Sequence, residues 1–444
     1  MVQPTPEADA KMNRRTEHET PIGGRSAVSI SLGLCLALLG ILIFGPAKPP
    51  IDSKWTIPTA MSFIRGNGGD ISEYVGTTGL EAITTVGNRQ YNFFPMGTAL
   101  VSVPAVSIVA LLYPNLLEKE KISYAPTVEK IIASIFATLA AVVFFWVIYD
   151  RFRNVAIALL STLVLMFCTS MWSTATRALW AHGPLVLMVV IAMLLLSRAR
   201  QRPALAQYVS LPLAMGFIIR PTAVAPIAVL SLYVLLVHRA WFVRYMAWAT
   251  LIATPWIVFN LWSFGAPLPA YYAPNRLAGG LPIWQGVAVN LVSPARGLLV
   301  FSPILLFAIS GFVLALRARE DLGLHVAFAA IVVLHLLIVS DFPTWWAGHS
   351  YGPRFMTDVL PFLVYFFAFN IRAIVPIDSI RRATASAVIA FFIAASVLIH
   401  AQGAYRLGPD RWNVAPSNVD KNPSRIWDWR DLQFTRGIAF LNPE

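Results

Sequence analysis

Charged residues are scarce in this chain of 444 residues, since Asp, Glu, Lys and Arg together make up only 13% of it. Soluble domains contain roughly 25% charged residues. The low share leaves too little charge to cover a globule in water, which excludes an ordinary soluble protein. Because 57% of the residues are hydrophobic, we expect lipid to contact much of the surface.

Cysteine is rare as well, and the two that exist, Cys35 and Cys168, lie within apolar segments. We interpret them as small core residues rather than as a disulfide or a metal site. The sequence has no HExxH spacing, no P-loop and no GxSxG motif, and so it gives no support for a zinc hydrolase or for transport driven by ATP. It indicates no certain cofactor and leaves the use of a divalent metal open.

Acidic residues are fewer than basic ones, and the formal net charge is +12. In a soluble protein this excess favours a nucleic-acid partner. Here the basic residues lie in short gaps between apolar runs, which membrane topology and contact with anionic membrane lipids explain better. We therefore expect no nucleic-acid partner.

Long apolar runs, in contrast, are abundant, and many approach the ~20 residues that span a bilayer core. They lie approximately at 26–46, 95–113, 128–148, 155–172, 183–197, 205–219, 222–237, 243–262, 298–316, 324–340, 355–376 and 383–402. These runs predict an all-α, polytopic membrane protein with about eleven transmembrane helices, within a range of 10–13. We expect a disordered cytoplasmic N-terminus (1–25), a transmembrane domain (26–402) with a large first outer loop (47–94), and a C-terminal tail (403–444).

The short basic gaps predict the orientation through the positive-inside rule. Arg14, Arg15 and Arg25 precede the first run, which places the N-terminus in the cytoplasm. Alternation along the later runs places the C-terminal tail outside. The composition fits a multi-pass protein of a bacterial plasma membrane.

The run 95–113 conflicts with this alternation. It contains Pro95 and Pro104 and ends at Pro114. We interpret it as a broken or re-entrant segment, and a twelfth crossing is the alternative.

Several basic residues lie at the ends of runs that alternation places outside, against the usual bias. Charges in such places are often functional or paired, and a guanidinium fork fits phosphate oxygens. Pairing of each arginine with a lipid headgroup or a nearby carboxylate is the alternative. Together with two neighbouring imidazoles, these residues predict a site for a lipid phosphate. The predicted phosphate ligands are Arg177, His182, Arg220, Arg296, His349 and Arg354.

Asp52 lies a few residues after the first apolar run, and so it is held near the membrane surface. A carboxylate there can take a proton from an attacking hydroxyl, although a helix cap or a partner for Lys54 is the alternative. Aromatic and basic residues on the same side are possible substrate contacts, unless they belong only to the interfacial aromatic belt. These residues are Lys54, Tyr271, Tyr272, Trp345 and Trp346.

Short segments spread over nearly the whole chain carry a family resemblance. They are Asp52-Ser53-Lys54-Trp55, Phe94-Pro95-Met96-Gly97, the stretch Arg177 to Pro184, the stretch Ser293 to Leu299, Tyr351-Gly352-Pro353-Arg354-Phe355 and Trp427-Asp428-Trp429. In this order, they resemble the GT-C glycosyltransferases. The resemblance is to bacterial relatives of the dolichyl-phosphate-mannose protein mannosyltransferases (glycosyltransferase family 39) and to the lipid A aminoarabinose transferase.

This resemblance implies a many-helix fold whose first outer loop carries the catalytic acid, a position that Asp52 matches. It implies a polyprenyl-phosphate sugar as donor and transfer of a hexosyl or pentosyl group, with inversion, to an acceptor hydroxyl outside the cytoplasm. Asp52 stands alone where many members have an acidic pair. The acceptor, whether glycan, lipid or protein, stays open. A lipid-linked sugar flippase and an oligosaccharide ligase with a lipid-diphosphate donor are the alternatives.

Overall fold

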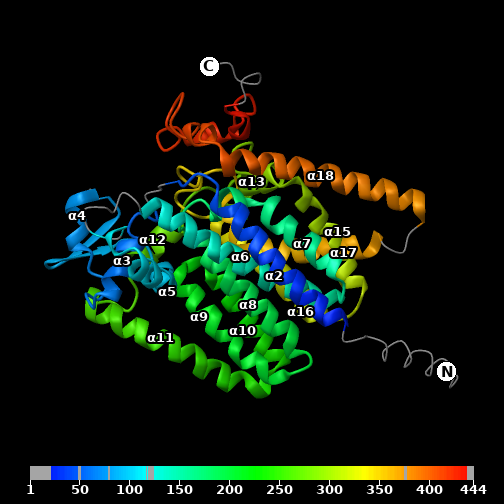
Figure 1. Ribbon diagram of the computed structural model, residues 1–444, viewed down its shortest axis with the longest axis horizontal. Helices are drawn as coiled ribbons and strands as arrows, with labels where there is room; N and C mark the ends of the chain where they lie inside the picture. Colours follow the sequence, from blue (N-terminus) through cyan, green and yellow to red (C-terminus); the bar gives the residue numbers. More distant parts are fainter. Residues whose placement is uncertain are drawn as a thin grey trace.

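Helices dominate the computed structural model of this protein, which describes residues 22–48, 52–78, 81–116, 118, 125–374 and 378–437. In these ranges, seven helical stretches are long and apolar enough to cross a membrane (Figure 1). They contain α2 (Ile22–Ile43), α6 (Ala125–Phe152), α8 (His182–Ala199), α11 (Phe242–Phe264), α16 (Leu322–Ser340), α17 (Leu360–Ile374) and α18 (Ser379–Tyr405). The predicted all-α class is confirmed.

Shorter apolar helices complete the bundle. They are α5 (Gly97–Leu112), α7 (Val155–Phe167), α9 (Ser210–Ile219), α10 (Val224–Val237), α13 (Ile283–Val292) and α15 (Phe307–Arg317). Small elements between them are α3 (Thr56–Ile64), α4 (Ser72–Thr78), β1 (Ile83–Val86), β2 (Arg89–Asn92), α12 (Pro274–Leu277), α14 (Leu298–Phe301) and α19 (Gly408–Arg411). The number of crossings stays a prediction, because six of the apolar helices have fewer than 18 residues.

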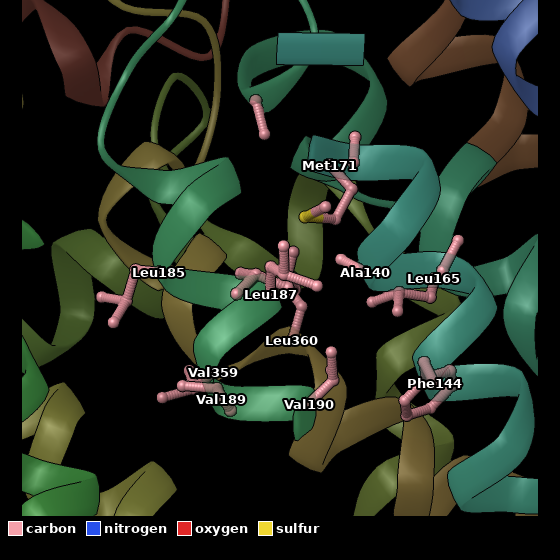
Figure 2. Close-up of a cluster of buried hydrophobic side chains, with 14 of the residues drawn as sticks. Ala140, Phe144, Leu165, Met171, Leu185, Leu187, Val189, Val190, Val359 and Leu360 are labelled. Atoms are coloured by element: carbon pink, nitrogen blue, oxygen red, sulfur yellow. The ribbon is translucent and has the colours of Figure 1, made fainter. Parts of the chain in front are cut away.

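The core lies where α6 and α8 pack against α7 and α17 (Figure 1). In their most apolar windows, 67% of the residues of α6 and of α8 are buried, against 11% for α11. Side chains such as Ala140 and Phe144 of α6 meet Leu187 and Val190 of α8 (Figure 2). The central helices are therefore apolar on all sides, while α11 presents most of its surface to lipid.

Two segments between the predicted apolar runs contain regular secondary structure. The first outer loop contains a β-hairpin in which β1 pairs antiparallel with β2, from Ile83 opposite Asn92 to Val86 opposite Arg89. The stretch 263–297, which lies between apolar runs in the sequence, contains the apolar helix α13 packed against α16. Helix α13 has only ten residues, which is too short to stand out among the long apolar runs.

The interpretation of run 95–113 as broken is wrong, because α5 is one continuous helix through Pro104. Its first residues and those of α6 nevertheless lie at the same end of the bundle. Thr98 of α5 lines a pocket with Leu179, and the backbone N–H of Leu179 donates to Glu129 of α6. The chain is therefore back at its starting end where α6 begins, and a re-entrant path for 95–113 stays a prediction.

The structure describes the predicted N-terminal segment and the predicted C-terminal tail to different extents. The N-terminal segment lies outside the described residues up to residue 21, and α2 begins at Ile22 rather than at residue 26. The tail beyond α18 packs on the loops at the Asp52 end of the bundle, where Trp412, Val419 and Ile426 form a buried cluster with Val289 and Ala295. Lys48, at the start of the first loop, pairs with Asp410 of the tail at 2.7 Å, and therefore the first loop and the tail share one end.

Candidate functional site

A polar pocket opens at this end of the bundle. It encloses about 440 Å³, including its solvent-filled mouth. Three charged residues from separate segments line it, namely Asp52 after α2, Arg220 at the end of α9, and Arg354 before α17. Aromatic side chains complete the wall.

Arg354 is held from two sides. Its guanidinium forms an ion pair with Asp52 and lies over the ring of Trp180, 4.1 Å from the ring centre. A guanidinium stacks on an aromatic face through the ring quadrupole while its edge stays free to donate hydrogen bonds. The segment 177–184 thus supplies a platform for an arginine that lies far away in sequence.

His182, the first residue of α8, is fully buried between two arginines and an aspartate. Its Nδ1 lies 2.7 Å from Asp358, and its Nε2 lies 3.1 Å from Arg220 Nη1 and 3.3 Å from Arg354 Nε. Guanidinium nitrogens only donate, and therefore Nε2 must accept and Nδ1 carries the proton. The imidazole is neutral here, and it orients the two arginines.

Asp358, which the sequence reasoning missed, anchors this arrangement. It is 3% exposed, and besides His182 it contacts Arg220 Nε at 3.1 Å and the hydroxyl of Thr222 at 2.9 Å. A carboxylate with three polar partners is well compensated in a buried place. Its position inside the predicted apolar run 355–376 was the signal, because an acid within such a run is usually functional or paired.

Both arginines keep donors for a ligand. Within the described part of the chain, Arg220 Nη2 and Arg354 Nη1 have no hydrogen-bond partner and are not among the fully buried atoms. Two guanidiniums therefore present free N–H groups to one pocket, which suits a tetrahedral oxyanion.

Gly97 explains one of the short motifs. A Cβ at this position would lie 2.4 Å from the backbone of Ile218 and of Ile219, and so only glycine lets α5 approach α9 this closely. The contact comes just before Arg220, while Phe94 and Pro95 line the pocket itself. The segment 94–97 therefore helps to place Arg220.

Arg177 belongs to a neighbouring network rather than to the pocket wall. It donates to the carbonyl of Gly403 at 2.6 Å and to Asp410 at 3.0 Å. Asp410 also pairs with Lys48 at 2.7 Å. Burial lowers the pKa of Lys48, and the charge of Asp410 offsets this only in part. This network ties the tail to the end of α2.

Arg296 lies elsewhere, at the junction between the loops and the tail. Its guanidinium donates to the carbonyls of Trp346 and Gly348 and to the side chains of Gln433 and Asn413, at 2.8–3.0 Å. All its nitrogens are engaged within the protein, so Arg296 holds the tail in place instead of facing the pocket.

His349, Trp345 and Trp346 also contact the tail. The imidazole of His349 lies 3.1 Å from Asn418, and the indole of Trp346 donates to Asp420 at 2.7 Å. Both tryptophans pack on the buried cluster around Trp412. The structure thus separates these residues from the pocket formed by Asp52, Arg220 and Arg354.

The predicted substrate contacts Tyr271, Tyr272 and Lys54 fall into different places. Tyr271 lines the pocket, and burial raises the pKa of its hydroxyl, which is therefore a neutral donor. The hydroxyl of Tyr272 donates a hydrogen bond to the carbonyl of Phe217, at 2.8 Å. The ammonium of Lys54 lies over the ring of Trp55, 5.2 Å from its centre.

A second buried acid, Glu129 of α6, lies behind the pocket and was also missed. It accepts a hydrogen bond from Ser53 Oγ at 2.5 Å and one from the backbone of Leu179 at 3.3 Å. These two partners are the neighbours of Asp52 and Trp180. Glu129 therefore connects the segment of the ion-paired acid to the segment of the aromatic platform.

An apolar pocket adjoins the polar one. It encloses about 390 Å³ by the same measure, and its lining includes Phe63, Tyr91, Trp256 and Phe259. Phe94 and Pro95 line both pockets. A charged compartment and an aromatic compartment thus share one wall.

The described residues contain no group of three or more His, Cys, Asp or Glu side chains that could hold a metal ion. No family model matches the sequence, and no curated protein matches it significantly. A solved structure is similar in fold, namely ArnT from Cupriavidus metallidurans bound to undecaprenyl phosphate, ArnT being a GT-C glycosyltransferase. The two are 12% identical, the likeness covers 85% of this chain and 71% of ArnT, and the TM-score is 0.51.

Proposed function

Since this chain has the GT-C fold, we propose that it transfers a sugar from a polyprenyl-phosphate donor to an acceptor hydroxyl. The general class, a membrane glycosyltransferase with a lipid-linked donor, agrees with the likeness to ArnT. The site, the leaving group and the direction of transfer are part of the proposal.

One observation carries it: an arginine-lined pocket shares the wall Phe94–Pro95 with an aromatic pocket. A polyprenyl phosphate is an amphiphile whose anionic head is joined directly to an apolar chain. The free N–H groups of Arg220 and Arg354 suit the phosphate, and the aromatic compartment suits the first isoprene units.

In the proposed reaction, the acceptor oxygen attacks the anomeric carbon, and the bond from that carbon to the phosphate oxygen breaks. The phosphate leaves with the electron pair. Asp52 takes the proton of the attacking hydroxyl, while Arg354, which it pairs with, turns toward the growing charge on the phosphate. His182 is a positioning residue that keeps both guanidiniums aimed into the pocket. The carbon inverts because attack and departure occur on opposite faces.

We further propose that the pocket faces the outside, with the N-terminus in the cytoplasm and the tail extracytoplasmic. The basic gaps of the sequence support this orientation. First loop, tail and pocket share one end of the bundle, and one orientation therefore serves all three.

A lipid-diphosphate donor is the second candidate. The observation that favours it is the position of Lys48, whose ammonium lies 5.8 Å from the centre of the Trp180 ring that also carries Arg354. A diphosphate bound in the pocket would place its second phosphate between the side chains of Lys48 and Arg354. Parallel assays with monophosphate and diphosphate donors separate the two candidates, because only the correct leaving group supports turnover.

The test of the proposal is binding of polyprenyl phosphate to Arg354→Lys and Arg354→Ala. Losing one desolvated, charge-assisted contact costs ~2–5 kcal/mol, so Arg354→Ala should bind at least ~30-fold more weakly. Arg354→Lys should recover only part, because an ammonium lacks the fork. The matched control is Arg317→Ala, an exposed arginine at the end of α15. If both Arg354 variants fold and bind the lipid as the parent does, the phosphate does not bind in this pocket.

A further inference from the structure

A second charged hollow lies at the opposite end of the bundle. It encloses about 1440 Å³, including its open mouth, and is formed by the ends of α6 and α8 with the connection after α8. Four arginines line it: Arg153, Arg198, Arg200 and Arg202. The proposed transfer reaction makes no use of them.

Helix geometry places this hollow about one bilayer core away from the polar pocket. Helix α8 begins at His182, directly after the pocket-lining residue Ala181, and ends beside Arg198, a rise of about 24 Å at 1.5 Å per residue. Helix α6 similarly runs from Glu129 to Asp150, about 32 Å. The hydrocarbon core of a bilayer is ~30 Å thick, and so the hollow lies near the other membrane surface.

The charges of the hollow are not balanced. Asp150 is the acid in its lining, and it contacts Arg198 at 2.8 Å and Arg153 at 3.7 Å. Arg200 pairs with Asp321 at 2.7 Å. Arg202 is exposed and contacts no carboxylate in the part of the chain that the structure describes. At least two positive charges are thus left for an anion.

The wall below these arginines is apolar. Ile191, Leu194 and Leu195 of α8 are half-buried and line the same hollow. Together with Arg198, they occupy positions i, i+3, i+4 and i+7, which share one face of a helix. Along this face, apolar side chains are followed by a cationic one toward the end of α8. A phospholipid has the same order, with its acyl chains in the membrane core and its phosphate at the membrane surface.

We infer that this hollow binds an anionic phospholipid of the leaflet opposite the polar pocket. Its phosphodiester lies among Arg153, Arg198 and Arg202, and an acyl chain lies along the apolar face of α8. Arginine forks suit phosphate oxygens, and basic clusters between helices at a membrane surface bind acidic headgroups. This site does not depend on the sugar donor, and so it stands or falls independently of the proposed transfer reaction.

The test compares binding of phosphatidylglycerol and phosphatidylcholine to the purified full-length protein, by native mass spectrometry in detergent. The parent should prefer phosphatidylglycerol at least ~10-fold. The double variant Arg153→Gln/Arg202→Gln should lose about 30-fold in affinity for it, because each arginine near an anionic lipid contributes roughly a factor of five. The matched control Arg317→Gln/Arg372→Gln removes two exposed arginines outside the hollow and should change the affinity less than ~3-fold.

The single variant Arg202→Glu checks the same claim at an exposed position, and it should also weaken phosphatidylglycerol binding. Glycerol 3-phosphate, which has the headgroup phosphate but no acyl chain, should not displace the lipid at equal concentration. Equal binding of the two lipids by the parent overturns the inference. Equal loss in the control variant, or full displacement by glycerol 3-phosphate, does so as well.

Discussion

Asp358 provides the most demanding prediction, because it lies behind the polar pocket and yet orients the arginines that line it. Its carboxylate is 3% exposed and contacts His182 at 2.7 Å, Thr222 at 2.9 Å and Arg220 at 3.1 Å. Asp358→Asn removes the charge and turns an amide N–H₂ toward groups that also donate. Breaking a buried charge pair in this way costs ~3–5 kcal/mol.

Part of this free energy lowers the stability of the fold, and part weakens binding of the lipid. We expect Asp358→Asn to lower the free energy of unfolding and to weaken binding of polyprenyl phosphate at least ~10-fold, which corresponds to ~1.4 kcal/mol. The reason is that the amide has one acceptor oxygen where the carboxylate has two, so it cannot accept from both His182 and Arg220. The orientation of Arg220 and Arg354 by this network is then lost. Binding is measured per folded molecule, alongside thermal unfolding in detergent.

The control is Asp428→Asn, an exposed aspartate of the tail, which should change neither quantity. A double-mutant cycle with His182→Ala sharpens the result, because residues in one hydrogen-bond network couple by ~0.5–3 kcal/mol. Strictly additive effects of the two changes, or parental lipid binding by a folded Asp358→Asn protein, would refute the reasoning.

Four further predictions follow from other contacts. Gly97→Ala should weaken polyprenyl phosphate binding, because its Cβ would lie 2.4 Å from the backbone before Arg220, whereas Gly33→Ala, with open space around it, should not. Arg296→Ala should release the tail, because its guanidinium joins the loops to Gln433 and Asn413, and limited proteolysis would detect the release. Hydrogen bonds to a charged group contribute ~1.5–3 kcal/mol each, so the free energy of unfolding should fall by at least this amount. Burial would raise the pKa of Asp431, but hydrogen bonds from Arg436 and Arg425 outweigh it and hold this pKa below its usual value. The ionised Asp431 therefore stabilises the tail fully above pH ~4, and this stabilisation is lost as the pH falls further. Proteolysis of the tail should increase below pH ~4 in the parent and should depend less on pH in Asp431→Asn. A cysteine at Lys421, exposed on the tail, should react with an impermeant reagent in intact cells, and reaction only after permeabilisation would reverse the proposed orientation.

The bundle was predictable from sequence because apolar runs of this length have few alternatives in lipid. The hairpin β1–β2 and the helix α13 were not, since each is short and depends on packing against neighbours. Pro104 wrongly suggested that run 95–113 is broken, because a proline within a membrane helix is tolerated where neighbours satisfy the freed carbonyl.

For the candidate site, the outward-placed charges of Asp52, Arg220 and Arg354 pointed to the segments that the structure brings together. Sequence position alone could not distinguish these residues from Arg296, which lies outside the pocket. The partners of Arg296, Gln433 and Asn413, come from a tail more than a hundred residues later. Asp358 was overlooked although an acid in an apolar run is itself a signal.

The central claim is that the pocket of Asp52 and Arg354 performs sugar transfer from a polyprenyl phosphate, and turnover by Asp52→Asn tests it most directly. The measurement is release of polyprenyl phosphate per folded molecule at saturating sugar donor, with donor affinity determined in parallel. General base catalysis supplies ~100- to 10,000-fold, and we therefore expect a loss in this range. Binding of the donor should be unchanged or tighter, because Arg354 loses a competing carboxylate. An Asp52→Asn protein that turns over at the parental rate would contradict the account.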